Sequence, residues 1–468
     1  MRCALVSALA GAWLTAGVLA QAPAPDTAAG RQLRAWLAVF HDGDRAARQE
    51  FYKEHWAYTP NQTFYEDLLN QTGGFELVRI EESTGTRTIA LARQIDADTI
   101  SRLRFEVEPE APHRIVRFTA QPIPRPPDLA IQRLSETDLL QTLREDLERR
   151  AKADRFSGAV LIAKHGTPIV ATAYGFADRE AKAPNRVDTR FRNGSMTKMF
   201  TAVATLALVE AGKLSLDDTI VELIPEYANK TLASKVTIHH LLTHTGGTGD
   251  IFGAQYNAHR QELRTHQDYV NLFGPRSLLF EPGSQWAYSN YGFVLLGAII
   301  EKVSGQSYYD YVRDRVFARA GMTATGSDPE DALLPNSSIS YTRRAGATGW
   351  QRAQMLGYRG IAAGGGLTTV EDLRRFADAL MNHRLLTAEN TTLLTTGNVR
   401  SGAGQYAYGF VDVMINGLRA IGHSGGAPGQ TGDLLILPES GYVVAVLANM
   451  DPPVAPRISN FIANRLPR

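Results

Sequence analysis

The sequence predicts an α+β protein with two successive folded parts. In the first part, a helical pattern gives way to stretches in which apolar and polar residues alternate at period two, the pattern of strands with one buried face. In the second part, residues 157–164 and 167–174 predict two strands joined at His165-Gly166, and an apolar run suited to a helix follows Ser195. Both parts therefore combine helices with strands.

The chain begins with a segment that has the features of a secretory signal peptide. Residues 1–20 contain one basic residue, Arg2, followed by an apolar core and the small-residue end Val18-Leu19-Ala20. We expect cleavage after Ala20 and a secreted or periplasmic mature protein, with an uncleaved anchor as the alternative. The only cysteine, Cys3, lies in this segment, so the mature chain would form no disulfide.

Composition and charge exclude some classes of function. The 49 Lys and Arg residues balance 48 Asp and Glu residues, and no basic run is interleaved with aromatic residues, so nothing favours nucleic acid as a partner. After residue 20 no stretch is long and apolar enough to cross a membrane. The expected partner is a small-molecule or peptide substrate, and the sequence leaves the oligomeric state open.

The first domain, residues 27–122, is expected to be a small α+β domain of unassigned role. Its predicted helices cover residues 32–41, 43–52 and 63–70, and its predicted strands cover 75–82, 87–95, 101–108 and 113–121. Three helices followed by a four-stranded meander loosely resemble the nuclear-transport-factor-two-like cone fold. Residues 123–134, rich in proline, predict a stiff linker to a second domain that spans residues 135–468 and opens with a helix over 135–153.

The segment Asn193-Gly194-Ser195-Met196-Thr197-Lys198 places a hydroxyl and an amine three residues apart. On a helix such residues share one face, and Gly194 permits a tight entry into that helix. Unpaired N–H groups at a helix start favour negative charge on a nearby oxygen. Ser195 is therefore a candidate nucleophile and Lys198 the group that holds or accepts its proton. The alternative is an exposed lysine on an ordinary helix, because Ser-x-x-Lys alone is a common pattern.

A metal site is not expected. His240 and His244 are four residues apart, but no Glu lies between them as in His-Glu-x-x-His, and no further ligand is evident nearby. The sequence therefore predicts neither a metal nor another cofactor.

Two more motifs follow along the chain. Tyr288 and Asn290 lie in a loop punctuated by Pro and Gly, just before an apolar helix at residues 293–303, although packing alone would also explain a tyrosine there. Near the C-terminus, Gly422-His423-Ser424-Gly425-Gly426 offers backbone against which a substrate could lie, because glycines carry no side chain.

These three motifs together resemble the serine β-lactamase and penicillin-recognising superfamily, on the branch of class C β-lactamases, D,D-peptidases and related esterases. The family's Ser-x-x-Lys, Tyr-x-Asn and Lys/His-Thr/Ser-Gly match residues 195–198, 288–290 and 423–425 in this order. The resemblance implies a β-lactamase/transpeptidase-like fold, with the site between an antiparallel sheet and a helical lobe. In that fold the sheet would be formed by residues 157–174 and by strands near 418–423, 431–437 and 442–448, with helices 135–153 and 455–466 packed against it.

The resemblance also implies a mechanism. Ser195 would attack an acyl carbonyl, and Tyr288 with Lys198 would take the proton. Burial would lower the pKa of Lys198, and a nearby ammonium would favour the Tyr288 phenolate. The backbone N–H groups of Ser195 and Gly426 would hold the oxyanion. The residues expected to contact the substrate are Asn290, His423, Ser424 and Gly425.

Position 423 departs from the lactamase pattern, since an imidazole binds a carboxylate less strongly at pH 7 than the ammonium of Lys-Thr-Gly. In the family, the His form accompanies D,D-peptidases and esterase-like members. His423 would face either the acid group of the substrate or the Tyr288 hydroxyl. We therefore expect a serine hydrolase that forms an acyl-enzyme with amide or ester substrates, like a D,D-carboxypeptidase or an esterase.

Two other functions remain open. β-Lactamase activity is the alternative within the same class. A non-catalytic penicillin-binding or cell-wall-sensing protein is the alternative of a different class, against which the intact Ser195, Lys198 and Tyr288 argue.

Overall fold

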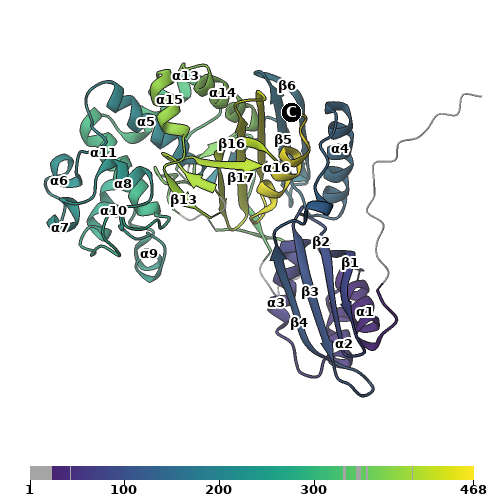
Figure 1. The fold of residues 1–468 in the computed structure, drawn as a ribbon. Coiled ribbons are helices and arrows are strands. Elements are labelled where there is room, and N and C mark those ends of the chain that lie inside the picture. Colours follow the sequence, from purple (N-terminus) through teal and green to yellow (C-terminus); the bar gives the residue numbers. More distant parts are fainter. Residues whose placement is uncertain are drawn as a thin grey trace, which may run out of the picture. The chain divides into compact units, whose positions relative to one another are not determined.

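The computed structural model describes residues 24–468 except 43, 330–331, 333, 344–348, 355–356 and 403. The expected signal peptide lies outside the described residues. The chain divides between Ala130 and Ile131 into two compact units, both drawn in Figure 1. Within the described residues, no helix is long and apolar enough to cross a membrane.

The first unit consists of three helices and an antiparallel four-stranded sheet in the order β1-β2-β3-β4. Aromatic rings fill the space between helices and sheet. The ring centres of Trp36 and Phe40 of α1 are stacked 4.4 Å apart, and those of Trp36 and Phe118 of β4 lie 4.7 Å apart. The element order is the one expected from the sequence, and the resemblance to the cone fold stays a prediction. Its elements are α1(Ala28–Asp42), α2(Arg45–His55), α3(Gln62–Thr72), β1(Phe75–Ser83), β2(Arg87–Gln94), β3(Ile100–Val107), β4(Ile115–Ile123) and η1(Pro127–Leu129).

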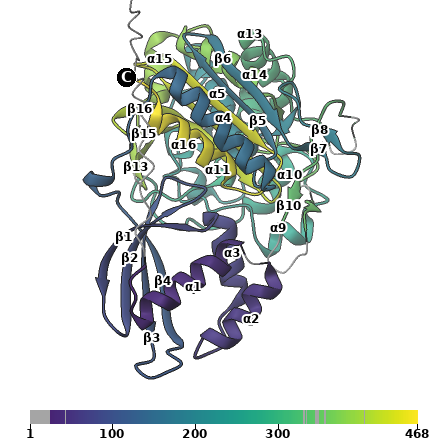
Figure 2. The same cartoon turned by 90° about the vertical axis from the view of Figure 1, so that its right-hand side faces the viewer.

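The second unit is built on an antiparallel sheet of eight strands in the order β13-β14-β15-β16-β17-β18-β5-β6. Both faces of the centre of this sheet are buried, and alternate residues of β5 belong to different hydrophobic cores. Leu161 faces the helical lobe, whereas Val160 and Ile162 face α4 and α16. Figure 2 shows α4 and α16 side by side across this second face. The elements of the sheet and of this face are α4(Glu136–Lys152), β5(Gly158–Lys164), β6(Thr167–Tyr174), β13(Val399–Ser401), β14(Gly404–Tyr406), β15(Val411–Ile415), β16(Leu418–Ala427), β17(Gln430–Leu437), β18(Tyr442–Ala448) and α16(Val454–Arg465).

The helical lobe packs around α11, which is buried from Asn290 to Ile300 and contacts α5, α8 and α10. A helix that is apolar on all sides belongs in the centre of a lobe. The helices and turns of this part are η2(Gly194–Met196), α5(Thr197–Glu210), α6(Ile220–Leu223), α7(Lys230–Ala233), α8(Ile238–Leu242), α9(Ala254–His259), α10(His266–Phe273), α11(Asn290–Ser304), α12(Tyr308–Val312), η3(Arg313–Phe317), α13(Ala318–Ala320), α14(Val370–Met381) and α15(Ala388–Thr395). The short strands are β7(Phe176–Asp178), β8(Ala183–Pro184), β9(Phe191–Arg192), β10(Tyr341–Thr342), β11(Gln351–Arg352) and β12(Leu367–Thr368).

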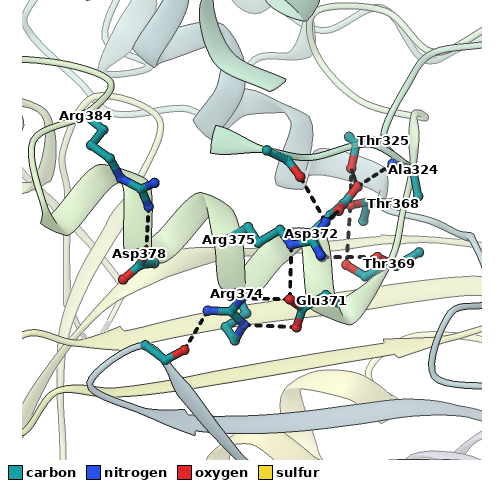
Figure 3. Close-up of polar contacts among 12 residues, drawn as sticks. Ala324, Thr325, Thr368, Thr369, Glu371, Asp372, Arg374, Arg375, Asp378 and Arg384 are labelled. Carbon is teal, nitrogen blue, oxygen red and sulfur yellow. Dashed lines mark hydrogen bonds and ion pairs between the residues drawn. The ribbon is translucent and has the colours of Figure 1, made fainter. Parts of the chain in front are cut away.

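A buried carboxylate at the start of α14 supports the segment that leads to Ser195. Asp372 Oδ2 accepts hydrogen bonds from the Ala324 N–H and the Thr325 hydroxyl, both at 2.8 Å, as Figure 3 shows. Thr325 in turn contacts Thr368 at 2.8 Å. Because Thr368 lies in β12, which pairs with β9 just before Ser195, Asp372 connects the helical lobe to the nucleophile segment.

Replacing Asp372 should therefore destabilise the second unit. Asp372→Ala leaves two half-buried donors without their acceptor, and we expect a loss of about 2 kcal/mol in the free energy of unfolding. Asp372→Asn keeps an acceptor and should lose clearly less. The control is Asp378→Ala, at another aspartate of α14. It removes a half-exposed ion pair with Arg384 and should cost less than about 1 kcal/mol. Urea denaturation measures all three, and equal losses for Asp372→Ala and Asp378→Ala would contradict this role.

Candidate active site

Ser195 lies in the tight turn η2, and α5 begins two residues later, which places Lys198 in the first helical turn. Gly194 has φ +52°, in the left-handed region that glycine tolerates best. A Cβ atom at this position would also lie 2.7 Å from the Gly426 nitrogen of β16. Both the turn and the close approach of β16 therefore require glycine at position 194, in agreement with the tight helix entry expected from the sequence.

The free edge of β16 runs past the nucleophile. Pairing of β15 with β16 ends at Val411↔Gly422, and beyond it β16 contacts η2. A Cβ atom on Gly425 would lie 2.0 Å from the Asn193 oxygen and 2.9 Å from the Ser195 nitrogen, so only a glycine backbone fits. Ser195 and Gly426 then line one cavity of about 220 Å³ together with Tyr288 and Asn290. This arrangement suits the expected oxyanion hole, which remains a proposal.

Lys198 is fully buried beneath this cavity. Its Nζ atom donates to Asn290 Oδ1 at 2.7 Å and to the Ala363 carbonyl at 2.6 Å, and it lies 4.7 Å from the centre of the Tyr288 ring. Burial lowers the pKa of Lys198 to about 7, although the charge of Asp250 acts in the opposite direction. Because a neutral amine has two N–H groups, the two acceptors leave its lone pair available for a proton.

Tyr288 is partly exposed, and its hydroxyl interacts with the side chain of Ser195. Burial of its hydroxyl raises the pKa of Tyr288, and the contact with Ser195 offsets only part of this rise. Desolvation is the largest effect on Tyr288 and favours the neutral phenol, so the structure gives no support to the phenolate expected beside Lys198. The site combines a phenol with an amine whose pKa is near neutrality.

His423 is buried and turned away from the cavity described above. Its Nδ1 lies 2.5 Å from the Ser424 carbonyl, which only accepts, so Nδ1 carries the hydrogen and Nε2 accepts from the Tyr406 hydroxyl at 3.1 Å. Burial and the charge of Lys198 lower the pKa of His423 to about 4, which makes the imidazole neutral at pH 7. These contacts support neither of the two partners expected for His423, the Tyr288 hydroxyl and a substrate acid group, because Nε2 already bonds to Tyr406.

The structure thus brings together Ser195, Lys198, Tyr288, Asn290 and Gly426. The other two expected substrate contacts lie on β16 beside this group, with Ser424 exposed and Gly425 buried against Asn193. Their contact with a substrate stays a prediction.

His244 holds the chain on both sides of Tyr288, a role that its spacing from His240 does not indicate. Its carbonyl accepts from the Ala287 N–H at 3.0 Å, its Nδ1 accepts from the Ser289 N–H at 3.1 Å, and its ring centre lies 4.4 Å from that of Tyr288. His240 instead caps its own helix α8. Among the described residues, no group of three or more His, Cys, Asp or Glu could hold a metal ion.

The carbonyl of Ala363 is a second feature that the sequence did not indicate. His266 Nε2 accepts from the Ala362 N–H at 3.1 Å, while His266 Nδ1 lies 3.1 Å from Glu301 Oε1. The Thr201 hydroxyl donates to the Ala362 carbonyl at 2.7 Å. The backbone next to the Lys198 acceptor is thereby fixed by side chains of α10 and α5, with Glu301 of α11 behind His266. A backbone acceptor leaves no signal in the sequence.

An antiparallel sheet flanked by helices, with a serine, a buried lysine and a tyrosine beside a helical lobe, defines a serine hydrolase of the penicillin-recognising class. The Beta-lactamase family profile matches residues 141–466, and the chain belongs to this family. This confirms the family and the fold expected from the sequence.

Several characterised proteins are similar to this chain. Penicillin-binding protein 4* of Bacillus subtilis (strain 168) is 31% identical over 314 residues, covering 62% of this chain and 67% of the relative. Esterase EstB of Burkholderia gladioli is 35% identical over 219 residues, which cover 43% of this chain and 56% of the esterase, so the match spans little more than half of that relative. The crystal structure of a penicillin binding protein from Bacillus halodurans superposes with a TM-score of 0.61 at 33% identity and covers 69% of this chain and 97% of that one.

If Lys198 and Tyr288 transfer the same proton, the effects of replacing them on kcat should be non-additive. Tyr288→Phe and Lys198→Ala should each lower kcat by several orders of magnitude, and the double variant should lose little more than either alone. The measurement is kcat for a 4-nitrophenyl ester in all four proteins, with folding checked by circular dichroism. A double variant whose loss equals the product of the single losses would mean that the two residues act independently.

Proposed function

We propose that this serine hydrolase cleaves amide or ester bonds of small-molecule or peptide substrates through an acyl-enzyme at Ser195, like a D,D-carboxypeptidase or an esterase. The observation that carries the proposal is the buried amine of Lys198, with a pKa of about 7, 4.7 Å from the ring centre of a tyrosine whose hydroxyl interacts with Ser195. A base of that strength is half deprotonated near pH 7, where a general base works best.

In the proposed first half-reaction, Ser195 Oγ bonds to the carbonyl carbon and its proton passes to the Tyr288 oxygen. Tyr288 gives its own proton to the lone pair of Lys198, so no free phenolate has to form. The backbone N–H groups of Ser195 and Gly426 stabilise the oxyanion. When the bond to the leaving group breaks, the same proton returns through Tyr288 to the departing nitrogen or oxygen.

In the second half-reaction, water takes the place of the leaving group. Tyr288 and Lys198 accept a proton from the attacking water while its oxygen bonds to the acyl carbon. The bond to Ser195 Oγ then breaks, Oγ regains a proton, and the acid product leaves. Atoms and charges balance without a cofactor.

Position 423 favours a peptidase or esterase over a β-lactamase. The ammonium of the Lys-Thr-Gly form is replaced by an imidazole that is neutral at pH 7 and bound to Tyr406. The similarity to a protein named as an esterase is consistent with this choice.

We also infer that the protein acts outside the cytoplasm, secreted or periplasmic, because residues 1–20 have the composition of a signal peptide. In this proposal the hydrolase domain spans residues 135–468, the linker 123–134 and the small domain 27–122.

Covalent labelling tests the proposed chemistry. A fluorophosphonate probe should label the protein at Ser195, and Ser195→Ala should abolish labelling while leaving the fold intact. The control is Ser215→Ala, which changes an exposed loop serine and should label like the natural protein. Mass spectrometry locates the adduct, and labelling of a different serine would overturn the assignment.

Turnover of a substrate panel then separates the candidate activities. The panel contains 4-nitrophenyl butyrate, a peptide ending in D-Ala-D-Ala and nitrocefin. We expect cleavage of the ester or the peptide to exceed that of nitrocefin. Nitrocefin as the best of the three substrates would make the protein a β-lactamase, and labelling without turnover of any would favour a binding protein.

A further inference from the structure

The side chain of Asn290 is held at both ends of its amide. Its Oδ1 accepts from Lys198 Nζ at 2.7 Å, and its Nδ2 donates to Asp250 Oδ2 at 3.1 Å. A half-turn of the amide would exchange these two ends and point the NH2 group at the amine. Because a carboxylate only accepts hydrogen bonds, Asp250 holds the NH2 group and leaves the oxygen facing Lys198. The acceptor that Lys198 meets is therefore determined by Asp250.

The loop that carries Asp250 is fastened to the start of α11. The Ser289 hydroxyl, which caps this helix, donates to the Gly249 carbonyl at 2.5 Å. The Ile251 N–H donates to Asp250 Oδ1 at 2.6 Å, and Arg276 Nη1 donates to the Asp250 carbonyl, also at 2.6 Å. Both carboxylate oxygens thus have a donor, and the carboxylate has a fixed place beside the first residue of α11.

The charge of Asp250 acts on the two groups that transfer the proton. Burial is the main influence on the pKa of Lys198 and lowers it, whereas the charge of Asp250 opposes this effect. Burial raises the pKa of Tyr288, the interaction with Ser195 lowers it, and the charge of Asp250 raises it again. One negative charge therefore favours both the ammonium of Lys198 and the neutral phenol of Tyr288. In the proposed mechanism the proton moves toward the same amine when Ser195 attacks.

We propose that Asp250 is a positioning residue for the reaction at Ser195, which orients the Asn290 amide and stabilises the ammonium form of Lys198 while it carries the proton. This role rests on the proposed acyl-enzyme chemistry. Asp250 is absent from the described lining of the cavity, so it acts through Asn290 and through its charge rather than on the substrate. No bond to Asp250 forms or breaks. A base that is oriented by a third group is a recurring arrangement around activated nucleophiles.

The pH dependence of the reaction should report on Lys198. The described charged and titratable groups around this amine and its cavity are Asp250, Tyr288, His244, His423, Arg192 and Arg359. Burial lowers the pKa of His423 to about 4, lowers that of His244 well below its ordinary value and raises that of Tyr288. Guanidinium groups stay charged in proteins. The acid limb of kcat/KM near pH 7 therefore reflects the loss of a proton from Lys198.

Asp250→Asn tests both parts of the proposal. The new amide has a single acceptor oxygen for two donors, the Ile251 N–H and the Asn290 NH2 group, so the orientation of Asn290 is no longer enforced. We expect kcat for 4-nitrophenyl butyrate to fall by about 10- to 100-fold, with KM changed by less than about threefold. Because the lost negative charge makes the ammonium of Lys198 less stable, the pKa of Lys198 falls and the acid limb moves to lower pH.

Two further variants serve as controls. Asp250→Glu keeps the negative charge and should leave the acid limb near pH 7, even where the longer side chain lowers kcat. Asp188→Asn removes the carboxylate of an exposed ion pair with Arg186, in which the two charged groups lie 2.8 Å apart. It should change neither kcat nor the acid limb.

Asn290→Ala separates the orienting role from the effect of charge. With no amide left to orient, adding Asp250→Asn to Asn290→Ala should lower kcat by less than about threefold. The charge still acts directly on Lys198, so the acid limb should move to lower pH in this background too. Full multiplication of the two losses in kcat would overturn the orienting role.

The outcomes separate this proposal from the proposed function. If Asp250→Asn folds, as judged by circular dichroism, and its acid limb coincides with that of the natural enzyme, the positioning role is overturned and hydrolysis at Ser195 stands. If Asp250→Asn does not fold, Asp250→Glu decides: a reduced kcat with an unmoved limb supports the role, and a limb that moves although the charge is kept overturns it. A natural protein with neither labelling nor turnover would instead overturn the proposed function.

Discussion

The chemistry of this site depends on the removal of the Lys198 amine from water. In water a lysine has a pKa of about 10.4 and is an ammonium at pH 7. In the protein, α5 and α11 bury it, and burial lowers the pKa of Lys198 to about 7. The Asn290 and Ala363 oxygens accept from its nitrogen in either protonation state, so the proton can come and go without rearrangement of the site.

The surrounding helices are arranged so that these two acceptors stay in place. Asn290 is the first residue of the buried helix α11, and its amide is held by Asp250 at 3.1 Å. The Ala362–Ala363 backbone is held by His266 of α10 and Thr201 of α5, and Glu301 of α11 orients His266. The apolar interior of the helical lobe thus has a functional consequence, because its packing excludes water from Lys198 Nζ and fixes the positions of the two acceptors around it.

Much of this could be predicted from the sequence, because the reacting groups are defined by residue type and spacing. Ser195, Lys198, Tyr288 and Asn290 lie in recognisable motifs, and the strands at the centre of the sheet are continuous apolar runs. The role of Ala363 could not be predicted, since a carbonyl belongs to every residue. The Tyr406 partner of His423 and the raised pKa of Tyr288 depend on packing between segments far apart in the chain. The strands β13 and β14 at one end of the sheet escaped prediction, because three residues each give too little periodicity.

The most direct test of this account is a titration of Lys198 itself. Lysine labelled with carbon-13 at Cε reports the protonation of each amine by NMR, and Lys198→Arg identifies the signal. The account predicts a Lys198 signal that shifts with a midpoint near pH 7, ammonium below and amine above. A Lys198 signal that titrates near the ordinary lysine value of about 10.4 would show that the amine is an ammonium at neutral pH and would contradict its role as the base.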